Sequence, residues 1–248
     1  MMFNLSKMVK VLVSVLVVVL SGNLYLNAVD VNSDFDDAEV EDVQKADPAE
    51  QSEVEDFNIE DRENKIMLSA PHCWQKYKNG RKYKRETKTG ILVKEVSKQL
   101  NLPCIYKTKF YKNDPNSDEK STYRAELVDF INKNQIKLLF DIHSMNANRE
   151  EDICIGINNG ENIFNRMDLC EVIKNTFNEF KIDKVSVDMP FKASKSTVIS
   201  YDISHKCKIP CFQIEINNRF LFATYDTYNY QLIKKVLIEI ISEIEKRI

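Results

Sequence analysis

The 248-residue sequence predicts an α/β fold, a three-layer α/β/α sandwich built on a mixed, mostly parallel sheet. Short apolar runs of strand length alternate with stretches whose apolar residues recur at a helical period, which is the order typical of βαβ units. Two of the runs, Ile136–Ser144 and Pro210–Asn217, have the composition of strands buried on both faces. Polar side chains interrupt both runs towards their carboxyl ends, where open α/β sheets bind ligands.

Length and charge indicate one folded domain preceded by a tail. The chain is 43% hydrophobic and 29% charged, which suits a globular domain. Asp30–Glu63 contains 15 acidic and two basic residues, a local charge of −13, so with −3 for the whole chain the remainder carries +10. Its basic residues are scattered and form no Lys/Arg block. This charge suits an anionic small substrate and does not indicate nucleic acid.

The N-terminus has the pattern of an export signal. Two lysines precede Val11–Leu20, where every residue except Ser14 is Val or Leu, and a membrane span would need about 20 apolar residues. Residues 1–29 are therefore predicted to be a signal peptide or, if uncleaved, a membrane anchor; a Val-rich buried strand is a third alternative. The protein is expected to be secreted or anchored outside the cytoplasm, with no other membrane contact. Residues 30–63 are predicted to be an acidic disordered linker, and residues 64–248 the folded domain.

Six strands are predicted from apolar runs that are bounded by turn or loop residues. The first, Lys65–His72, runs directly into a histidine, and Asp152–Ile157 has an alternating pattern. The polar, basic segment 77–84 and the turn-rich segment 113–118 are predicted surface loops. In chain order, the predicted strands are 65–72, 104–108, 136–144, 152–157, 184–188 and 210–217.

Five helices are predicted between and after these strands. In the first, Leu92, Val96 and Leu100 fall on one helical face, and the others have similar apolar stripes. Ser121 or Thr122 is placed to cap the second helix. The predicted helices are 91–100, 121 or 122 to 134, 167–180, 196–206 and 228–248.

The six cysteines form no CxxC pair and no zinc-finger spacing. Cys104 and Cys211 each follow a proline at the start of an apolar strand and are interpreted as small buried hydrophobes. If the protein is exported, one or two disulfides are possible, and the sequence does not pair them.

Three predicted strand ends carry side chains that can do chemistry. His72 ends one strand, and His143 ends another with Asp141 two residues before it on the same side. Gln213 and Glu215 interrupt a third. Two histidines and a carboxylate are the ligands of a catalytic zinc site, and a further carboxylate can act as the general base. A single histidine could instead be a core residue bonded to a backbone carbonyl, but no basic neighbour in the sequence explains a buried Glu215.

The segments Ser69–His72, Glu86–Gly90, Asp141–His143 and Gln213–Asn217, in this order, resemble motifs of the N-formylglutamate amidohydrolase-like proteins. These proteins belong to the zinc-dependent exopeptidase folds and are related to the zinc carboxypeptidases. The resemblance runs from Ile66 to Phe222. It implies one zinc ion per chain, with His72, Glu86 and His143 as its ligands and Glu215 as the general base.

The sequence departs from the family pattern near the expected pocket. Ser144 stands where the family often has glycine, and Gly156-Ile157 stands where it has a Gly-Thr pair. The substrate is therefore not inherited from the family name.

Arginines are the remaining candidates for the site. The resemblance implies a pocket role for Arg149, which we assign to catalysis, and we predict that Gln213, Asn217 and Arg219 bind substrate. A guanidinium can hold a carboxylate with two hydrogen bonds or polarise the scissile carbonyl, and the sequence does not decide between these roles. For Arg219, a solvated loop charge is an equal alternative. Two further residues are predicted to stay outside the site: Arg124 as a surface or capping residue, and His205 as an exposed side chain.

The sequence thus predicts a metal-dependent amidohydrolase that cleaves a C–N amide bond of an N-acyl amino acid or a small acidic peptide. A poly-glutamate or cell-wall peptide hydrolase of the same chemistry is one alternative. A catalytically inactive binding module on this fold is another. A module without chemistry has no use for a buried base, so Glu215 favours an enzyme.

Overall fold

The computed structural model describes residues 56–78, 81–83, 85–109, 114–221 and 228–248. The predicted signal or anchor segment 1–29 and most of the predicted linker 30–63 lie outside the described residues, so both stay predictions. Within the described ranges, no helix is long and apolar enough to cross a bilayer.

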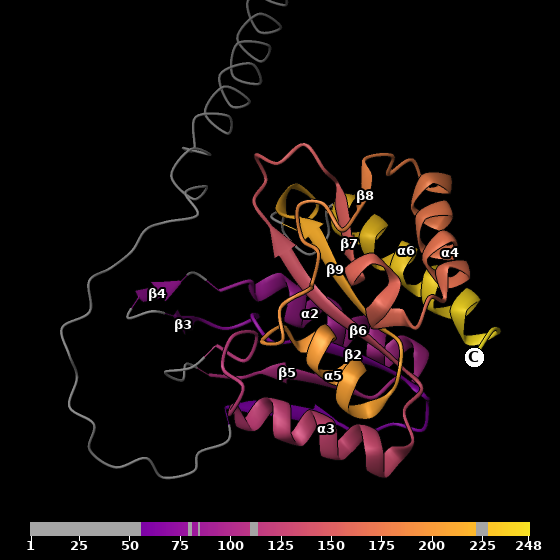
Figure 1. The fold of residues 1–248 in the computed structure, drawn as a ribbon. Coiled ribbons are helices and arrows are strands. Elements are labelled where there is room, and N and C mark those ends of the chain that lie inside the picture. Colours follow the sequence, from indigo (N-terminus) through magenta and orange to yellow (C-terminus); the bar gives the residue numbers. More distant parts are fainter. Residues whose placement is uncertain (1–55, 79–80, 84, 110–113, 222–227) are drawn as a thin grey trace, which may run out of the picture. The chain divides into compact units, whose positions relative to one another are not determined.

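Seven strands form one mixed sheet in the order β1-β5-β2-β6-β9-β7-β8 (Figure 1). The central strands β5, β2, β6 and β9 run parallel to one another. At one edge β1 is antiparallel to β5; at the other, β7 is antiparallel to β9 and parallel to β8. The strands are β1 Phe57–Glu60, β2 Ile66–Ala70, β5 Cys104–Lys107, β6 Leu138–Met145, β7 Ile153–Gly156, β8 Val185–Val187 and β9 Cys211–Asn217.

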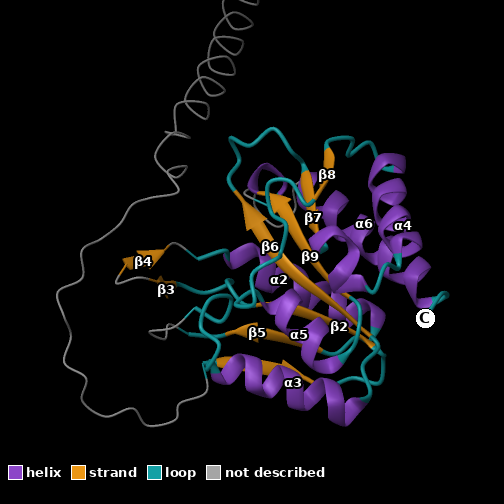
Figure 2. Ribbon diagram, in the orientation of Figure 1, coloured by secondary structure: helices purple, strands orange, loops and turns teal. Residues whose placement is uncertain are grey.

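Helices cover both faces of this sheet, which confirms the predicted three layers (Figure 2). On one face, α2, α4 and α6 bury the larger hydrophobic core, to which Leu92, Ile173 and Ile240 belong. On the other face, α3 and α5 bury a smaller core with Leu127 and Ile203. The helices are α2 Thr87–Leu100, α3 Thr122–Asn134, α4 Met167–Glu179, α5 Ile199–Cys207 and α6 Tyr228–Glu245, and two 3₁₀ helices span Asn158–Ile163 and Asn218–Phe220.

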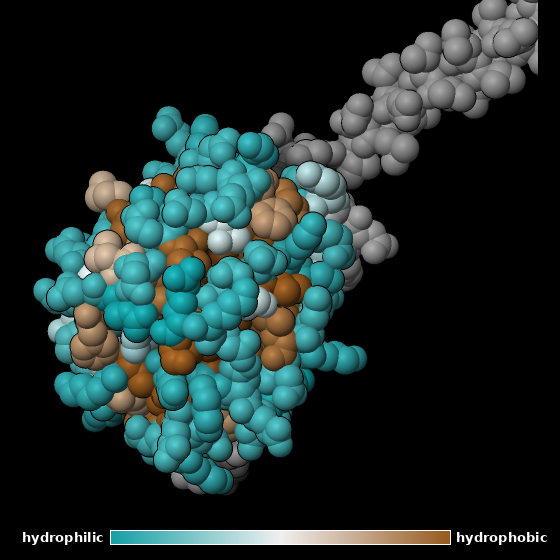
Figure 3. Space-filling view, turned by 90° about the vertical axis from the view of Figure 1, so that its right-hand side faces the viewer, coloured by the Kyte–Doolittle hydropathy of each residue, from teal (hydrophilic) through white to brown (hydrophobic). Residues whose placement is uncertain are grey.

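The helices are amphipathic because only one side of each meets the sheet. In α6, for example, Ile233, Ile240 and Ile244 are fully buried, whereas Asn229 and Gln231 are exposed. The molecular face shown in Figure 3 is mainly hydrophilic, with hydrophobic residues visible between the polar ones. Ser121 caps α3, as predicted, by accepting a hydrogen bond from the backbone N–H of Arg124.

The alternation of side chains along the central strands places the polar groups on one face. In β6, Leu138, Phe140 and Ile142 enter the larger core, and Leu139 enters the smaller core. Asp141 and His143 continue the row of Leu139, because residues two apart share a face. The row of Gln213 and Glu215 in β9 follows Cys211 of the smaller core in the same way. The polar groups therefore lie on the α3/α5 face, beyond the end of the smaller core.

Two sequence predictions fail in this part of the chain. The acidic linker was expected to reach residue 63, but Phe57–Glu60 forms β1 and pairs with β5. The sequence of this segment has no strand-like periodicity, because an edge strand needs few buried side chains. The expected surface loop 77–84 contains a short hairpin of β3 (Lys76–Lys78) and β4 (Arg81–Tyr83).

All six cysteines are free, and all except the half-buried Cys207 are buried. Cys104 and Cys211 are completely buried, which confirms the interpretation of these two residues as core hydrophobes. Burial raises the pKa of the Cys73 thiol to about 12, so this thiol stays protonated.

The edge strand β1 yields a prediction about truncation. Asp56, just before β1, forms an ion pair with Lys107, and both side chains are buried. A chain that starts at residue 56 is expected to keep the fold, whereas one that starts at residue 64 loses β1, its pairing with β5 and the buried ion pair with Lys107. Breaking a buried ion pair costs about 3–5 kcal/mol, so the shorter chain should be less stable by at least about 3 kcal/mol in urea unfolding. Equal stability of the two chains would show that β1 and its ion pair contribute nothing.

Candidate metal centre

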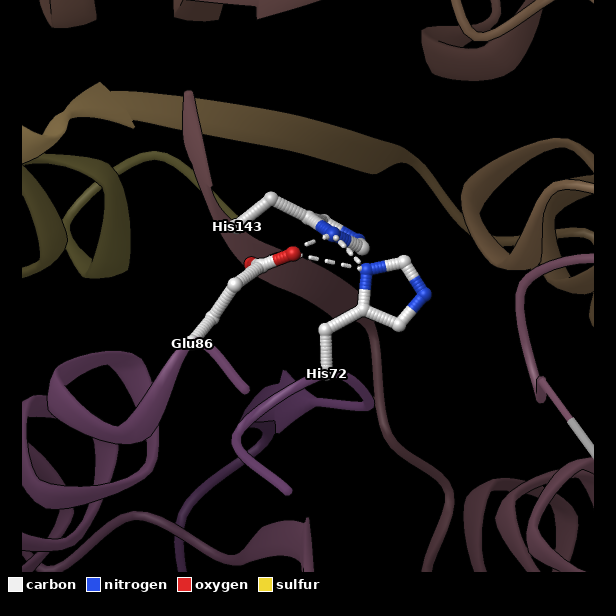
Figure 4. Close-up of side chains that lie close together, drawn as sticks. All are labelled: His72, Glu86 and His143. Carbon is white, nitrogen blue, oxygen red and sulfur yellow. Dashed lines mark hydrogen bonds and ion pairs between the residues drawn. The ribbon is translucent and has the colours of Figure 1, made fainter. Parts of the chain in front are cut away.

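His72, Glu86 and His143 meet at the carboxyl ends of the central strands (Figure 4). His72 lies two residues after β2, His143 lies within β6, and Glu86 immediately precedes α2. Because β2 and β6 are parallel neighbours, the two histidines are at the same edge of the sheet. A backbone hydrogen bond of 2.8 Å from Glu86 N–H to the carbonyl of His72 holds the start of α2 against this edge.

The candidate ligand atoms of these residues converge on one point. Nδ1 of His72 lies 3.2 Å from Nδ1 of His143 and 3.0 Å from Oε1 of Glu86. Nδ1 of His143 lies 3.9 Å from Oε2 of Glu86, and the three groups can offer ligand atoms that are all within 4.8 Å of one another. The backbone N–H of Ser144 donates to Oε2 of Glu86 at 2.8 Å. Since this bond uses the backbone, a serine at this position serves as well as a glycine.

A carboxylate stands behind each histidine. Nε2 of His72 bonds to Asp114 at 2.7 Å, and Nε2 of His143 bonds to Asp141 at 2.9 Å. A carboxylate only accepts hydrogen bonds, so each Nε2 donates to its aspartate, and both Nδ1 atoms face the centre, where Glu86 lies 3.0 Å from Nδ1 of His72. The two Nδ1 atoms are 3.2 Å apart, a separation that needs a proton or a metal ion between them.

The electrostatics of the site favour a positive charge. Burial lowers the pKa of His143, but the charge of Asp141 and the hydrogen bond to it, together with the charges of Glu215 and Glu86, outweigh burial and raise this pKa to about 9. The same carboxylates would attract a bound cation.

The donor set fits zinc. Two imidazole nitrogens and one carboxylate oxygen are the ligands of many catalytic zinc sites, and three protein ligands leave a position for water or substrate. The carboxylates behind the two histidines match the outer shell that orients metal-binding imidazoles. His72, Glu86 and His143 are thus the residues that would hold the ion.

Glu215 lies directly beside this cluster. In the parallel pair β6–β9, it is the register partner of His143 and points to the same face. Its carboxyl is almost fully buried, and Gln213 Nε2 donates to its Oε1 at 3.0 Å. A buried carboxylate next to a metal centre is placed for proton transfer.

Of the other predicted substrate-binding residues, Asn217 and Arg219 already have protein partners. The side chain of Asn217 donates to the carbonyls of Arg149 and Glu151. The guanidinium of Arg219 donates to Asp152 and to the carbonyls of Arg149 and Glu150. Both residues hold the loop that follows β6, and their roles in substrate binding stay predictions.

The guanidinium of Arg149 is more available. It is exposed and lies 4.9 Å above the ring of Phe191. The Phe191 carbonyl in turn accepts a hydrogen bond from Cys154, whose register partner in β9 is Glu215. This chain of contacts puts Arg149 on the Glu215 side of the site.

Sequence reasoning missed two residues that support the site. Asp114 lies in the segment predicted as a turn-rich loop, and nothing in its local sequence indicates the bond to His72.

Arg124 was expected at the surface but is 1% exposed. It donates to the carbonyls of Pro115 and Thr197 and pairs with Asp202, which ties the Asp114 loop to α5. A basic residue on the inner side of a helix was the only available signal. His205 is exposed, as expected.

The fold is similar to that of known structures. It matches a bacteriophage poly-gamma-glutamate hydrolase with a TM-score of 0.55 and 16% identity, over 81% of this chain and 94% of that one. It also matches a gene product of Agrobacterium tumefaciens with a TM-score of 0.54 and 12% identity, over 78% of this chain and 97% of that one. At these identities the similarity concerns the fold alone. No family model and no curated protein matches the sequence, so membership of the N-formylglutamate amidohydrolase-like family stays a prediction.

The cluster yields a direct prediction about metal content. Purified protein should carry about one zinc ion per chain, and His143→Ala should lose it because two ligands remain. Metal analysis after dialysis measures both, with His205→Ala on the exposed face of α5 as the control. Removing zinc from the wild type should also lower its melting temperature, since a ligand that binds only the native state stabilises it. Stoichiometric zinc in His143→Ala would remove this residue from the ligand set.

Proposed function

We propose that the protein is a zinc-dependent amidohydrolase that cleaves a C–N amide bond of an N-acyl amino acid or a small acidic peptide. The observation that carries this proposal is a three-ligand cluster, His72, Glu86 and His143, with Glu215 directly across the β6–β9 pair from His143. The hydrophobic segment 11–20 supports a place of action outside the cytoplasm.

The roles follow from the chemistry of each group. A zinc ion at this cluster would act as a Lewis acid on the scissile carbonyl and would activate water. Glu215 takes a proton from the attacking water and passes it to the leaving amine. Gln213 donates to one oxygen of Glu215 and so helps to orient this carboxylate. Burial of Glu215 and both histidines keeps bulk water away from these groups.

An anionic substrate group would bind to Arg149. Within the described part of the chain, the Arg149 guanidinium contacts a ring face and forms no hydrogen bond, so its N–H groups can receive a carboxylate. The N–H groups of the Arg219 guanidinium already donate hydrogen bonds to Asp152 and to two backbone carbonyls. This difference favours Arg149 as the substrate anchor and Arg219 as a loop support.

A hydrolase for poly-glutamate or cell-wall peptides is the second candidate, and it uses the same catalytic groups. The fold shared with a phage poly-gamma-glutamate hydrolase supports it. A binding module without catalysis is the third, and the buried carboxyl of Glu215 argues against it.

Replacing Glu215 by Gln tests the enzyme proposal. The variant keeps the shape of the side chain but removes the base, so turnover of N-acyl glutamates and short acidic peptides should fall by about 10²–10⁴-fold. Zinc content should not change, because the ion needs only the other three ligands. Glu171→Gln, on the exposed side of α4, is the matched control.

Three results would contradict this assignment. Loss of zinc in Glu215→Gln would make Glu215 a ligand, and unchanged turnover would remove it from the mechanism. A zinc-loaded wild type that hydrolyses none of a broad panel of amides would favour the binding module.

The two arginines can be separated by substrate charge. Arg149→Gln should raise KM about 10–100-fold for an N-acyl glutamate, since a hydrogen bond to a charged group contributes about 1.5–3 kcal/mol. KM should hardly change for a substrate whose carboxylates are amidated. Arg219→Gln should instead lower the melting temperature, through the loss of its bonds to the loop after β6. The opposite pattern would exchange the roles of the two residues.

A further inference from the structure

A chain of buried hydroxyl groups continues behind His143, on the side away from the ligand cluster. Ser69 Oγ donates to Oδ1 of Asp141 at 2.8 Å, while Oδ2 of Asp141 bonds to His143. The hydroxyl of Tyr123 lies 2.9 Å from Ser69 Oγ and 3.1 Å from the carbonyl of Ile105. The side chains come from β2, β6 and α3, so the chain of bonds connects the sheet to the helix layer.

The direction of these bonds follows from the number of hydrogens. Ser69 has one hydroxyl hydrogen and gives it to Asp141, so Tyr123 shares its own single hydrogen between Ser69 Oγ and the Ile105 carbonyl. Burial, followed by the negative charge of Asp141, raises the pKa of Tyr123 well above its usual value, so the phenol keeps this hydrogen. The Ser69 hydroxyl thus donates to the carboxylate, Tyr123 contacts Ser69 from the helix layer, and hydrogen bonds in such a series strengthen one another.

Burial makes these bonds specific. Ser69, Tyr123, Asp141 and His143 are each at most 1% exposed, so these side chains bond to one another and not to bulk water. Ser69 stands on the same face of β2 as Met67, which packs in the smaller core, so burial alone would favour a hydrophobic residue at this position. A polar residue there is explained by the carboxylate that it bonds.

We propose that Ser69 and Tyr123 are positioning residues of the metal centre. They hold Asp141 in one orientation, Asp141 fixes the ring of His143, and Nδ1 of His143 is thereby presented to the ion. The proposal rests on the zinc site of the proposed function, but not on the reaction or the substrate. It assigns to two residues outside the ligand set a measurable share of the zinc affinity.

The experiment measures zinc affinity by competition with a chelator, without substrate. Ser69→Ala should weaken zinc binding about 10-fold, the lower end of the effect expected for loss of an outer-shell partner, because Ser69 bonds to that partner, Asp141, and not to the ligand itself. Tyr123→Phe should weaken it less, by at least about threefold, because Ser69 can still donate to Asp141. Tyr123→Phe keeps the aromatic ring and its edge contact with Phe57 at 5.7 Å between centroids. If Ser69→Ala does not fold, the zinc affinity of Tyr123→Phe therefore still tests the positioning role.

Matched controls separate positioning from stability. Ser97→Ala and Tyr106→Phe remove buried or nearly buried hydroxyls that bond to the Leu102 carbonyl and to Glu60 and do not contact Asp141. All four variants should destabilise the metal-free protein, but only Ser69→Ala and Tyr123→Phe should lose zinc affinity.

A double-mutant cycle tests whether Ser69 acts through Asp141. In the Asp141→Ala background, which removes the acceptor of the Ser69 hydroxyl, Ser69→Ala should change zinc affinity by no more than about twofold. A general structural role would give the same loss in both backgrounds and would overturn the proposal. Zinc affinity within about twofold of the wild type in both single variants would overturn it as well.

The outcome for the proposed function is separate. A wild type that binds zinc but hydrolyses no amide overturns the reaction and leaves the positioning role standing. A wild type that binds no zinc overturns both proposals.

Discussion

The whole site depends on the pairing of two buried imidazoles with two buried carboxylates. Asp114 and Asp141 each accept a hydrogen bond from Nε2 of one histidine, which turns the two Nδ1 atoms towards each other at 3.2 Å. Burying such polar groups costs free energy unless each is paired. Nδ1 of His72 also lies 3.0 Å from Glu86, so two imidazole nitrogens and a carboxylate face one another at the centre. The arrangement therefore favours a cation, and with Glu86 its donor set is that of a zinc site.

The sheet brings these groups together through two simple properties. Parallel strands end at the same edge, so residues near the ends of β2, β6 and β9 become neighbours although they are far apart in the sequence. Alternation along each strand then puts hydrophobic side chains on the larger core and polar ones on the α3/α5 face. The smaller core stops where the polar row of β6 and β9 begins, and Glu215 enters this row beside His143.

Local patterns were sufficient for the layers, the order of strands and helices, and the residues that end the central strands. They were not sufficient for residues whose role depends on a distant partner. Asp114 looks like an ordinary loop aspartate until His72 is placed beside it. Arg124 looks like a surface residue because its partners, Pro115, Thr197 and Asp202, are spread over other segments.

By itself, the sequence determined the α/β class, the buried central strands and the positions of His72, His143 and Glu215 at their ends, because period and residue type are local properties of the chain. Only the tertiary structure decided which nitrogen of each histidine faces the centre, and which arginine keeps its donors available. Both depend on hydrogen bonds between residues far apart in the sequence. Such bonds are set by strand register and helix packing, and no local pattern records them.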